Sequence, residues 1–363
     1  MRKTICYVAT SAGDWGGASR VLNVTLRLLD RSRFEPLVLF PEPGPILPDL
    51  DRRGIRYRIW GPLCEYTDPF SYAKAVARTW RFLQREKVAV LHINHSGFWR
   101  AAEMVGAKLA RVPILAHYHL VVDRPPPFTA LLARVIAVSE FVSRASESSG
   151  VSKTVVYNAV ELERFDTASD IRAELGIPAE ATVVGFVGQI RGIKGIDLFI
   201  RLASEIPDAS VRFLIAGECR ESKGYQDGYS RDRLMSEILN DPRILYVGYR
   251  SDVENIYRSA DILVMPSRWQ EPFGLINIEA GAARRPMVAS CVGGIPEVIR
   301  DGENGLLFDP DDFTSFVRAV RRLIDDKMLR AEMGRRARVI VEEEFTTKPI
   351  RRLEALYDAV AKR

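Results

Sequence analysis

Short apolar runs alternate with amphipathic segments along most of the chain. The apolar runs have the length of buried strands, and the segments between them carry apolar residues at helical spacing. In the first half, strands are predicted at residues 4–10, 37–40, 55–59, 88–93, 113–118, 135–138 and 154–157. In the second half they are predicted at 183–187, 212–216, 244–250 and 260–265. Repeated strand-helix units predict parallel sheets with helices on both faces, which is an α/β fold.

The pattern also predicts two domains. A chain of 363 residues is long enough for two ordinary cores. The alternation of strands and helices begins again at residues 183–187, after a segment at 158–165 that would cross from one domain to the other. Ligands of such sheets bind beyond the carboxyl ends of the strands, so we expect functional side chains in those loops.

Composition narrows the class of protein. Residues 1–165 carry 23 Lys and Arg against 15 Asp and Glu, and the remainder carries 29 against 32. A basic first half suggests an anionic partner there, although a generic charged surface explains it as well. No aromatic-interleaved basic tract indicates nucleic-acid binding. The four cysteines form no CxxC pair, which predicts a reduced, cytoplasmic protein, and no apolar run predicts a signal peptide or a membrane span.

The stretch from Glu271 to Glu279 carries the clearest chemistry. An apolar strand at 260–265 runs into a Pro- and Gly-marked turn that opens a helix, and a helix N-terminus is a seat for phosphate. Eight helical residues span roughly 12 Å, which exceeds the spacing of the acid pair in a glycoside hydrolase. The two carboxylates could therefore serve different parts of one ligand, Glu271 a sugar and Glu279 a ribose. They could equally be solvated helix carboxylates.

This stretch resembles the hallmark of the family 4 retaining glycosyltransferases, which have the GT-B fold. Their E-x-F-G-x-x-x-x-E pattern is present as Glu271, Phe273, Gly274 and Glu279. The resemblance covers nearly the whole chain and implies two Rossmann-like domains facing a central cleft. It implies domain bounds of 1–165 plus 346–363 for the acceptor-side domain, and of 166–345 for the nucleotide-sugar donor domain, with the C-terminal helix returning to the first domain.

Other stretches match the same family. The turn Gly16-Gly17-Ala18 matches a Gly-Gly that faces the donor. The segment at 188–195 resembles a phosphate-binding G-R-x-x-x-x-K-G pattern, but Gln189 replaces the Arg and Arg191 follows two residues later. Arg191 could replace that Arg, or Lys194 could hold the diphosphate with less charge. The resemblance implies catalytic roles for Glu271, His119, Lys194 and Arg191. It implies donor contacts by Gly16, Gly17, Gly188, Lys194, Gly248, Phe273, Gly274, Leu275 and Glu279.

All four histidines fall at the ends of two predicted strands. His92 and His95 follow one strand, and His117 and His119 end the next. A His-x-His metal site is an alternative, since both rings would share one face. No cysteine or carboxylate completes such a site nearby, and structural roles for all four are a further alternative. The resemblance favours His119 beside the donor sugar, and it implies no metal and no cofactor.

A basic stripe follows one predicted helix. Lys74, Arg78, Arg81 and Arg85 step by four, three and four residues. The stripe could rest on anionic headgroups at the inner face of a membrane, or it could be a solvated helix face.

The function predicted from the resemblance is metal-independent, retaining transfer of a sugar from a nucleoside-diphosphate donor. The acceptor would be a glycan or a lipid-linked molecule, in cell-surface polysaccharide synthesis. The alternatives are a non-hydrolysing sugar-nucleotide epimerase and a catalytically silent donor-binding homologue. The sequence does not indicate the base, the sugar or the acceptor.

Overall fold

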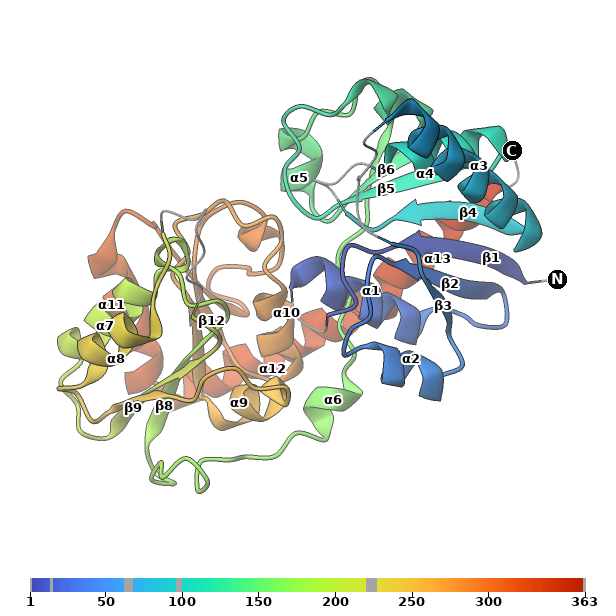
Figure 1. Ribbon diagram of the computed structural model, residues 1–363. Coiled ribbons are helices and arrows are strands. Elements are labelled where there is room, and N and C mark those ends of the chain that lie inside the picture. Colours follow the sequence, from blue (N-terminus) through green and yellow to red (C-terminus); the bar gives the residue numbers. More distant parts are fainter. Residues whose placement is uncertain (1, 14–15, 62–67, 96–99, 220–226, 362–363) are drawn as a thin grey trace. The chain divides into compact units, whose positions relative to one another are not determined.

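The computed structural model describes residues 2–361 apart from 14–15, 62–67, 96–99 and 220–226. Asp14 and Trp15 of the glycine-rich turn, Cys64, and Tyr225 and Gln226 of a predicted polar loop lie outside the described residues. The chain divides into two compact units. Unit 1 comprises residues 1–159 and 347–363, and unit 2 comprises residues 160–346. Figure 1 shows that each unit has its own sheet with helices packed on it.

Unit 1 contains a parallel sheet in the order β3-β2-β1-β4-β5-β6-β7. Its strands are β1 (Lys3–Val8), β2 (Phe34–Phe40), β3 (Arg56–Ile59), β4 (Val88–Ile93), β5 (Ile114–Tyr118), β6 (Arg134–Ala137) and β7 (Lys153–Val155). Its helices are α1 (Gly17–Leu28), α2 (Leu47–Arg52), α3 (Pro69–Arg85), α4 (Ala101–Leu109), α5 (Glu140–Ala145) and α13 (Thr347–Ala361), with the 3-10 turn η1 (Pro127–Leu131). The strand order reverses between β1 and β4, so the switch point of this sheet lies at their carboxyl ends.

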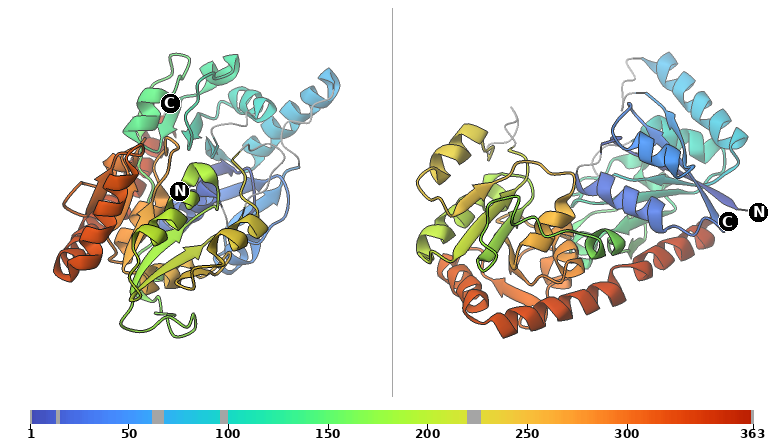
Figure 2. Two further views of the ribbon diagram at one scale, coloured as in Figure 1. Left: turned by 90° about the vertical axis from the view of Figure 1, so that its left-hand side faces the viewer. Right: turned by 90° about the horizontal axis from the view of Figure 1, so that it is seen from below.

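Helices α1 and α13 cover one face of the sheet in unit 1. Leu22 and Leu26 of α1 and Leu353 and Tyr357 of α13 share one core cluster with alternate residues of the strands. Because these side chains recur at helical spacing, each helix buries a single stripe against the sheet. Ion pairs add to this packing, as where Lys3 meets Asp358 at 2.5 Å, so β1 and the end of α13 lie side by side (Figure 2).

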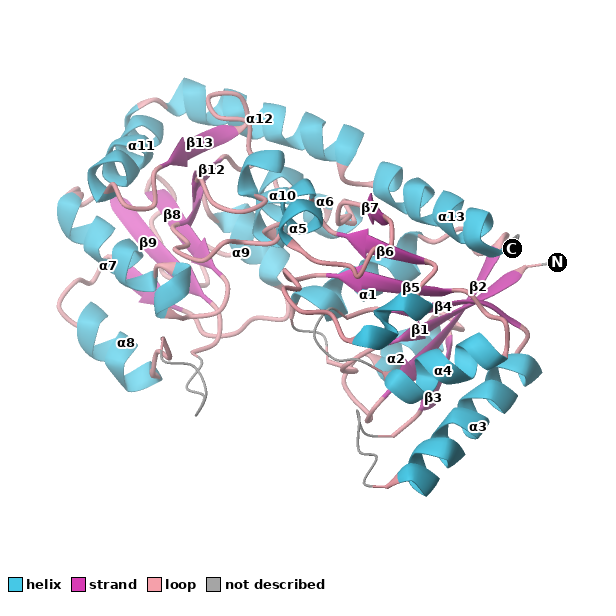
Figure 3. Cartoon of the chain, turned by 90° about the horizontal axis from the view of Figure 1, so that it is seen from above, coloured by secondary structure: helices cyan, strands magenta, loops and turns pink. Residues whose placement is uncertain are grey.

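Unit 2 contains a second parallel sheet in the order β10-β9-β8-β11-β12-β13. Its strands are β8 (Thr182–Val187), β9 (Val211–Ala216), β10 (Ile244–Tyr246), β11 (Ile262–Met265), β12 (Met287–Ser290) and β13 (Gly305–Phe308). Its helices are α6 (Glu163–Asp166), α7 (Ile196–Glu205), α8 (Arg231–Ile238), α9 (Val253–Ser259), α10 (Leu275–Ala282), α11 (Phe313–Asp325) and α12 (Lys327–Glu344), with 3-10 turns η2 (Gly192–Lys194) and η3 (Ile295–Glu297). Figure 3 shows the strands of this sheet lying between helices, and its switch point is between β8 and β11.

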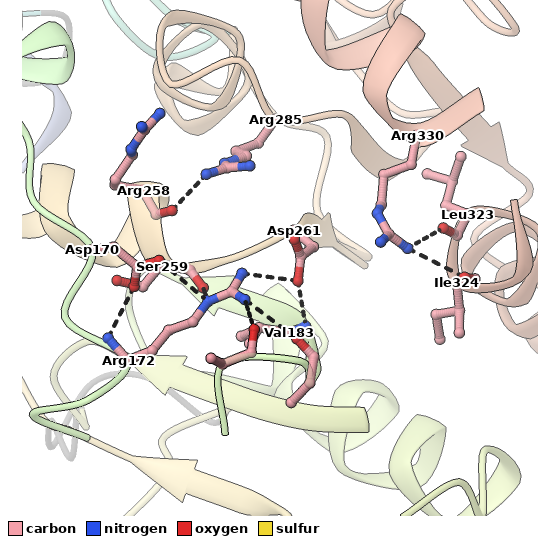
Figure 4. A network of polar contacts seen from close by, with 12 residues as sticks. Asp170, Arg172, Val183, Arg258, Ser259, Asp261, Arg285, Leu323, Ile324 and Arg330 are labelled. Atoms are coloured by element: carbon pink, nitrogen blue, oxygen red, sulfur yellow. Dashed lines mark hydrogen bonds and ion pairs between the residues drawn. The ribbon is translucent and has the colours of Figure 1, made fainter. Parts of the chain in front are cut away.

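A polar network ties the entry segment of unit 2 to the amino-end edge of its sheet (Figure 4). The Arg172 guanidinium donates to Ser259 O at 2.9 Å and to Asp261 Oδ2 at 3.0 Å. Asp261 Oδ2 also accepts the Val183 N–H at 2.8 Å, at the start of β8. The network therefore holds β8 and β11 together at the end opposite to their carboxyl-end loops.

The predicted fold class is confirmed: two parallel Rossmann-like sheets are present, and the C-terminal helix packs on the first. The division between the units falls at residue 159/160, whereas the sequence suggested 165/166. Phe165, which the sequence assigned to the first domain, packs edge-on against Tyr257 of α9 in unit 2, with ring centroids 5.8 Å apart. His92 lies within β4 rather than after it, and His117 lies near the end of β5, as expected.

Candidate active site

The switch point of unit 2 holds a buried ion pair. Lys194 ends the turn that follows β8, and Glu271 lies in the loop after β11. Their side chains meet at 2.5 Å between Lys194 Nζ and Glu271 Oε1, with 20% and 6% of each side chain exposed. Ser267 Oγ donates to the same carboxylate oxygen at 2.8 Å, and the Lys194 ammonium lies 4.4 Å from the centre of the Trp269 ring. The pair is thus fixed by two neighbours, and preorganised charge of this kind can stabilise a transferring phosphate group.

Glycines make this arrangement of loops sterically possible. Gly195 follows Lys194 with φ +76°, and a Cβ there would lie 1.9 Å from Pro266 O in the β11 loop. Gly293 has φ +56°, and its added Cβ would lie 2.1 Å from Glu271 O. Each glycine therefore permits a close approach of two backbones, and together these approaches place Lys194 beside Glu271.

The helix α10 begins directly beyond Glu271. Gly274 is its N-cap, with φ +78°, and no side chain caps this end by a hydrogen bond. Leu275 begins the helix and is half-buried. Phe273 is buried and packs edge-on against Phe345 at 5.8 Å, so any contact that it makes with a ligand would come from its backbone. The N-terminal end of α10 offers backbone N–H groups to an anion close in sequence to Glu271.

Glu279 lies on the second turn of α10 and is 5% exposed. Its Oε2 accepts a hydrogen bond from the Tyr257 hydroxyl at 2.7 Å. The solvated-carboxylate alternative does not hold for Glu271 or Glu279, because both are at least nine-tenths buried.

Arg191 lies beside the Lys194 turn but is held by a carboxylate. Its guanidinium forms a two-point ion pair with Asp227, at 3.0 Å for Nε and 2.6 Å for Nη2. The same contact keeps the pKa of Asp227 below its usual range. Gln189, which stands where the family pattern has Arg, is exposed. Of Arg191 and Lys194, it is therefore Lys194 that contacts Glu271 in the structure.

A cavity of about 460 Å³ opens at the carboxyl ends of β9 and β10. Glu218, Cys219 and Arg231 line one part of it, and residues 246–249 line the rest. Gly248 is among these, with φ +72°. The Tyr246 hydroxyl donates to Gly217 O at 3.1 Å, and burial raises the pKa of Tyr246 to about 12, so this hydroxyl stays protonated. This volume is large enough for a ligand of the size of a nucleoside.

Unit 1 contains a column of aromatic side chains at its own switch point. The Tyr357 hydroxyl lies 2.6 Å from His92 Nδ1 and 3.1 Å from the Tyr7 hydroxyl. The His92 and His117 ring centres are 5.3 Å apart, and those of His117 and His119 are 4.3 Å apart with the rings stacked. The column leads from α13 through two strands to His119 at the carboxyl end of β5.

Burial keeps these imidazoles neutral. Loss of hydration lowers the pKa of His92 to about 3 and that of His95 to about 4. It also lowers the pKa values of His117 and His119 well below the usual value, and the neighbouring histidines lower them further. At neutral pH the column can accept or donate hydrogen bonds but carries no charge.

The glycine turn after β1 meets the same edge of the sheet. Gly16 is the N-cap of α1 with φ +92°, and among the residues that the structure describes a Cβ there would meet nothing within 4 Å. Gly17 begins α1 and is exposed. Asn94, directly after β4, donates from Nδ2 to Ala18 O at 3.0 Å, and its Oδ1 lies 3.1 Å from His119 Nε2. A single amide thus joins the glycine turn to the candidate histidine.

Metal ligation finds no support in the described part of the chain, where no group of three or more His, Cys, Asp and Glu side chains could hold an ion. Within the same residues, no helix is both long and apolar enough to cross a bilayer.

Sequence reasoning missed the side chains that fix the candidate residues. Ser267, Trp269, Tyr257 and Asp227 are such residues in unit 2, and Asn94 is one in unit 1. Asn94 carried a usable signal, because it is the first residue after a strand at the switch point. The others became partners only through packing of loops distant in sequence.

Two family matches together span most of the chain. Residues 167–339 match "Glycosyl transferases group 1", and residues 15–164 match "Glycosyltransferase Family 4". The chain belongs to the group 1, family 4 glycosyltransferases. The predicted relationship is therefore confirmed, and the two matches correspond closely to the two units.

Curated relatives of this glycosyltransferase chain match about half of it. A D-inositol 3-phosphate glycosyltransferase of Corynebacterium kroppenstedtii is 32% identical over 220 residues, which is 57% of this chain and 48% of that protein. The enzyme of the same name from Mycolicibacterium smegmatis is 35% identical over 175 residues, 47% of this chain and 39% of that protein. The chain thus spans half or less of the length of these relatives.

Solved structures share the fold of this family member over its whole length. A glycosyltransferase from Rickettsia africae has a TM-score of 0.86 at 18% identity, covering 100% of this chain and 99% of that one. Anabaena Alr3699/HepE, crystallised with UDP and glucose, has a TM-score of 0.79 at 20% identity, covering 99% and 100%.

Proposed function

We propose that this protein transfers a sugar from a nucleoside-diphosphate donor to an acceptor hydroxyl, with retention of the anomeric configuration. The bond between the anomeric carbon and the β-phosphate oxygen breaks, and its electron pair stays on the phosphate. A bond forms from the acceptor oxygen to the anomeric carbon on the same face, and the acceptor proton passes to the departing phosphate. The observation that carries the proposal is the Lys194–Glu271 pair at the switch point of unit 2.

The Lys194–Glu271 pair and the N-terminal end of α10 would bind different parts of the donor. Negative charge develops on the β-phosphate as the nucleoside diphosphate departs. Lys194 and the N–H groups at Gly274 and Leu275 would stabilise that charge, which is the largest kind of catalytic contribution in such sites. Glu271, held by Ser267, would orient the sugar hydroxyls.

The remainder of the donor fits the other features of unit 2. Glu279 has a carboxylate that would accept hydrogen bonds from the ribose diol. The cavity beside Gly248 would receive the base. Gly188 follows β8 with φ +143° and lets the backbone approach the diphosphate closely. Arg191 remains a proposed second cation, which would have to leave Asp227 to reach the phosphates. No metal is required, because Lys194 and the helix start supply the positive charge.

On the acceptor side we place His119 and the glycine turn at Gly16 and Gly17 near the donor sugar. The acceptor would be a glycan or lipid-linked molecule in cell-surface polysaccharide synthesis. Helix α3 supports contact with an anionic inner membrane face, since Phe70 is 79% and Trp80 40% exposed on the same helix as the basic stripe. Arg78 of this stripe also lies 3.9 Å from the ring centre of Trp60.

The first experiment is a thermal-shift panel of UDP, GDP, ADP and CMP with their common sugar conjugates. A ligand at 100 times its Kd adds about 2.7 kcal/mol to the folded state, so a shift with one base identifies the donor class. UDP-glucose is the first conjugate to test, because a protein of the same fold was crystallised with UDP and glucose. Repeating the panel with EDTA tests the independence of metal.

The thermal-shift panel, followed by product analysis, distinguishes sugar transfer from the epimerase and silent-homologue alternatives. Product analysis with the identified donor alone distinguishes an epimerase, which would convert the donor without any acceptor. A shift with a nucleotide but no turnover with any acceptor would indicate a silent homologue. If no nucleotide shifts the transition, the proposed donor site is wrong.

A further inference from the structure

Asn94 is a buried amide whose two ends have different partners. It follows the last residue of β4 and is 3% exposed. Its backbone N–H donates to Val8 O at 3.0 Å, which fixes the residue against the end of β1. Its side-chain Nδ2 is 3.0 Å from Ala18 O, and its Oδ1 is 3.1 Å from His119 Nε2.

These contacts determine which nitrogen of His119 carries the proton. Ala18 O is a carbonyl oxygen and can only accept, so the end of the Asn94 amide that faces it must be the NH₂ group. The end that faces His119 is then a carbonyl oxygen, which also can only accept. His119 Nε2 must therefore donate, and in the neutral imidazole Nδ1 then has the lone pair.

We propose that Asn94 is a positioning residue that fixes His119 as the neutral, Nε2-protonated tautomer, so that Nδ1 carries the lone pair of the ring. Within the proposed glycosyl transfer, on which this role rests, Nδ1 of His119 acts as an acceptor of a hydrogen bond and not as a donor. The glycine turn sets the orientation of the amide through Ala18 O, so the turn acts on His119 through Asn94.

The surroundings of His119 support a neutral ring. The His117 ring stacks on it with ring centres 4.3 Å apart, and the His92 ring centre lies 5.3 Å from that of His117. Burial first, and then His117 and His95, lower the pKa of His119. An uncharged imidazole has one N–H and one lone pair, so assigning the N–H to Nε2 completes the assignment.

The direct test is the tautomer itself in the wild-type protein. The chain has only four histidines, so long-range ¹H–¹⁵N spectra of protein with ¹⁵N-labelled histidine contain four imidazole patterns. Single His→Gln variants assign them. We expect a pyrrole-like Nε2 and a pyridine-like Nδ1 for His119 at neutral pH. The opposite pattern, or equal populations of the two tautomers, would overturn the proposal without any variant of Asn94.

A matched pair of variants tests the role of Asn94. Asn94→Asp keeps an acceptor beside Nε2 but adds a negative charge, which we expect to raise the pKa of His119 by about one to two units. Asn304→Asp is the control, since Asn304 is also 3% exposed and also bonds through both ends of its amide, in unit 2. Asn304→Asp should leave the His119 resonances unchanged. Equal effects of the two variants, or no effect of Asn94→Asp, would contradict the proposal.

The activity measurement separates this inference from the proposed function. If the protein transfers sugar, Asn94→Asp should move the acid limb of the pH profile of kcat/KM to higher pH by the same shift that the His119 titration shows. A correct tautomer in a protein that transfers no sugar would leave the assignment of His119 intact and reject the proposed function. A pH profile that stays unchanged while the His119 titration moves would reject the role of Nδ1 in transfer.

Discussion

At the switch points of their sheets, the two units hold polar side chains of different character. In unit 2, Lys194 and Glu271 meet as opposite charges, with Ser267 and Trp269 around them. In unit 1, neutral imidazoles stack in a column that ends at His119. Both sheets are parallel, so the difference comes from the side chains that the central strands and their loops carry, and not from the sheet topology.

The difference indicates which part of a substrate each edge suits. A fixed cation next to a helix N-terminus stabilises phosphate charge, whereas uncharged acceptors and donors orient hydroxyl groups. Burial is tolerated in unit 2 because the charges are paired, and in unit 1 because the rings are neutral. The comparison can be tested by breaking the Lys194–Glu271 pair in unit 2 and by replacing a neutral histidine of the column in unit 1.

The largest effect is expected from breaking the ion pair. Lys194→Met should lower turnover by at least about 100-fold, because it removes a charge that stabilises the leaving group. It should also lower the free energy of unfolding by about 3–5 kcal/mol, since Glu271 is left buried without its partner. Kinetics and urea denaturation measure the two effects.

The double variant Lys194→Met/Glu271→Gln should recover most of that stability but none of the turnover. Arg335→Ala, which breaks an exposed ion pair with Glu332 on α12, is the control and should change neither quantity appreciably. Normal turnover in the double variant would show that the pair is structural only.

A smaller effect is expected from glycine substitutions in the two turns. Gly195→Ala combines a positive φ with a contact at 1.9 Å to Pro266 O, so it should lower the free energy of unfolding by about 3–5 kcal/mol. A Cβ at Gly16 meets no atom of the described residues within 4 Å, so its backbone angle is the main cost of Gly16→Ala, and a loss of about 1–2 kcal/mol is expected. Equal losses, measured by urea denaturation, would mean that the Lys194 turn relaxes freely.

The pH dependence of stability tests the neutral column. The pKa of His92 is about 3 in the folded protein and near 6.5 when unfolded, so the unfolded chain binds the proton more readily. Its contribution is therefore present above pH 6.5 and is lost as the pH falls towards 3. Between pH 7 and pH 5 this amounts to about 2 kcal/mol.

His92→Phe should remove that part of the pH dependence in urea-unfolding measurements at several pH values. Tyr357→Phe removes the hydrogen-bond partner of His92 but leaves its ring, so it should keep the slope. An unchanged slope in His92→Phe would show that His92 is not buried in its neutral form.

The smallest effect is expected at Arg191. Its guanidinium is bound to Asp227, so Arg191→Ala should weaken nucleotide binding by less than about tenfold, or about 1.4 kcal/mol. Calorimetric titration of Lys194→Met and Arg191→Ala with the same nucleotide gives the comparison. A loss as large as that of Lys194→Met would mean that Arg191 leaves Asp227 when the donor binds.

Much of the fold could be predicted because its causes are local in sequence. Strand-length apolar runs and helical spacing predicted the seven strands of the first sheet and four of the second, but not β12 or β13. The Pro- and Gly-marked turn after 260–265 placed Glu271 before a helix. The spacing of Lys74, Arg78, Arg81 and Arg85 predicted the helix that is α3. Each of these signals depends on residues within one or two turns of each other.

The partners of the candidate residues were decided by tertiary structure alone. Arg191 and Asp227 are 36 residues apart, Lys194 and Glu271 are 77 apart, and His92 and Tyr357 are 265 apart. Such pairs form only when separate loops are folded onto one edge of a sheet, and a side chain then bonds whichever group the packing brings within reach. The sequence by itself therefore determined which chemical groups stand at the carboxyl ends of the strands. The folded structure decided which of them are paired and which are neutral, and it placed Asn94 against one nitrogen of His119.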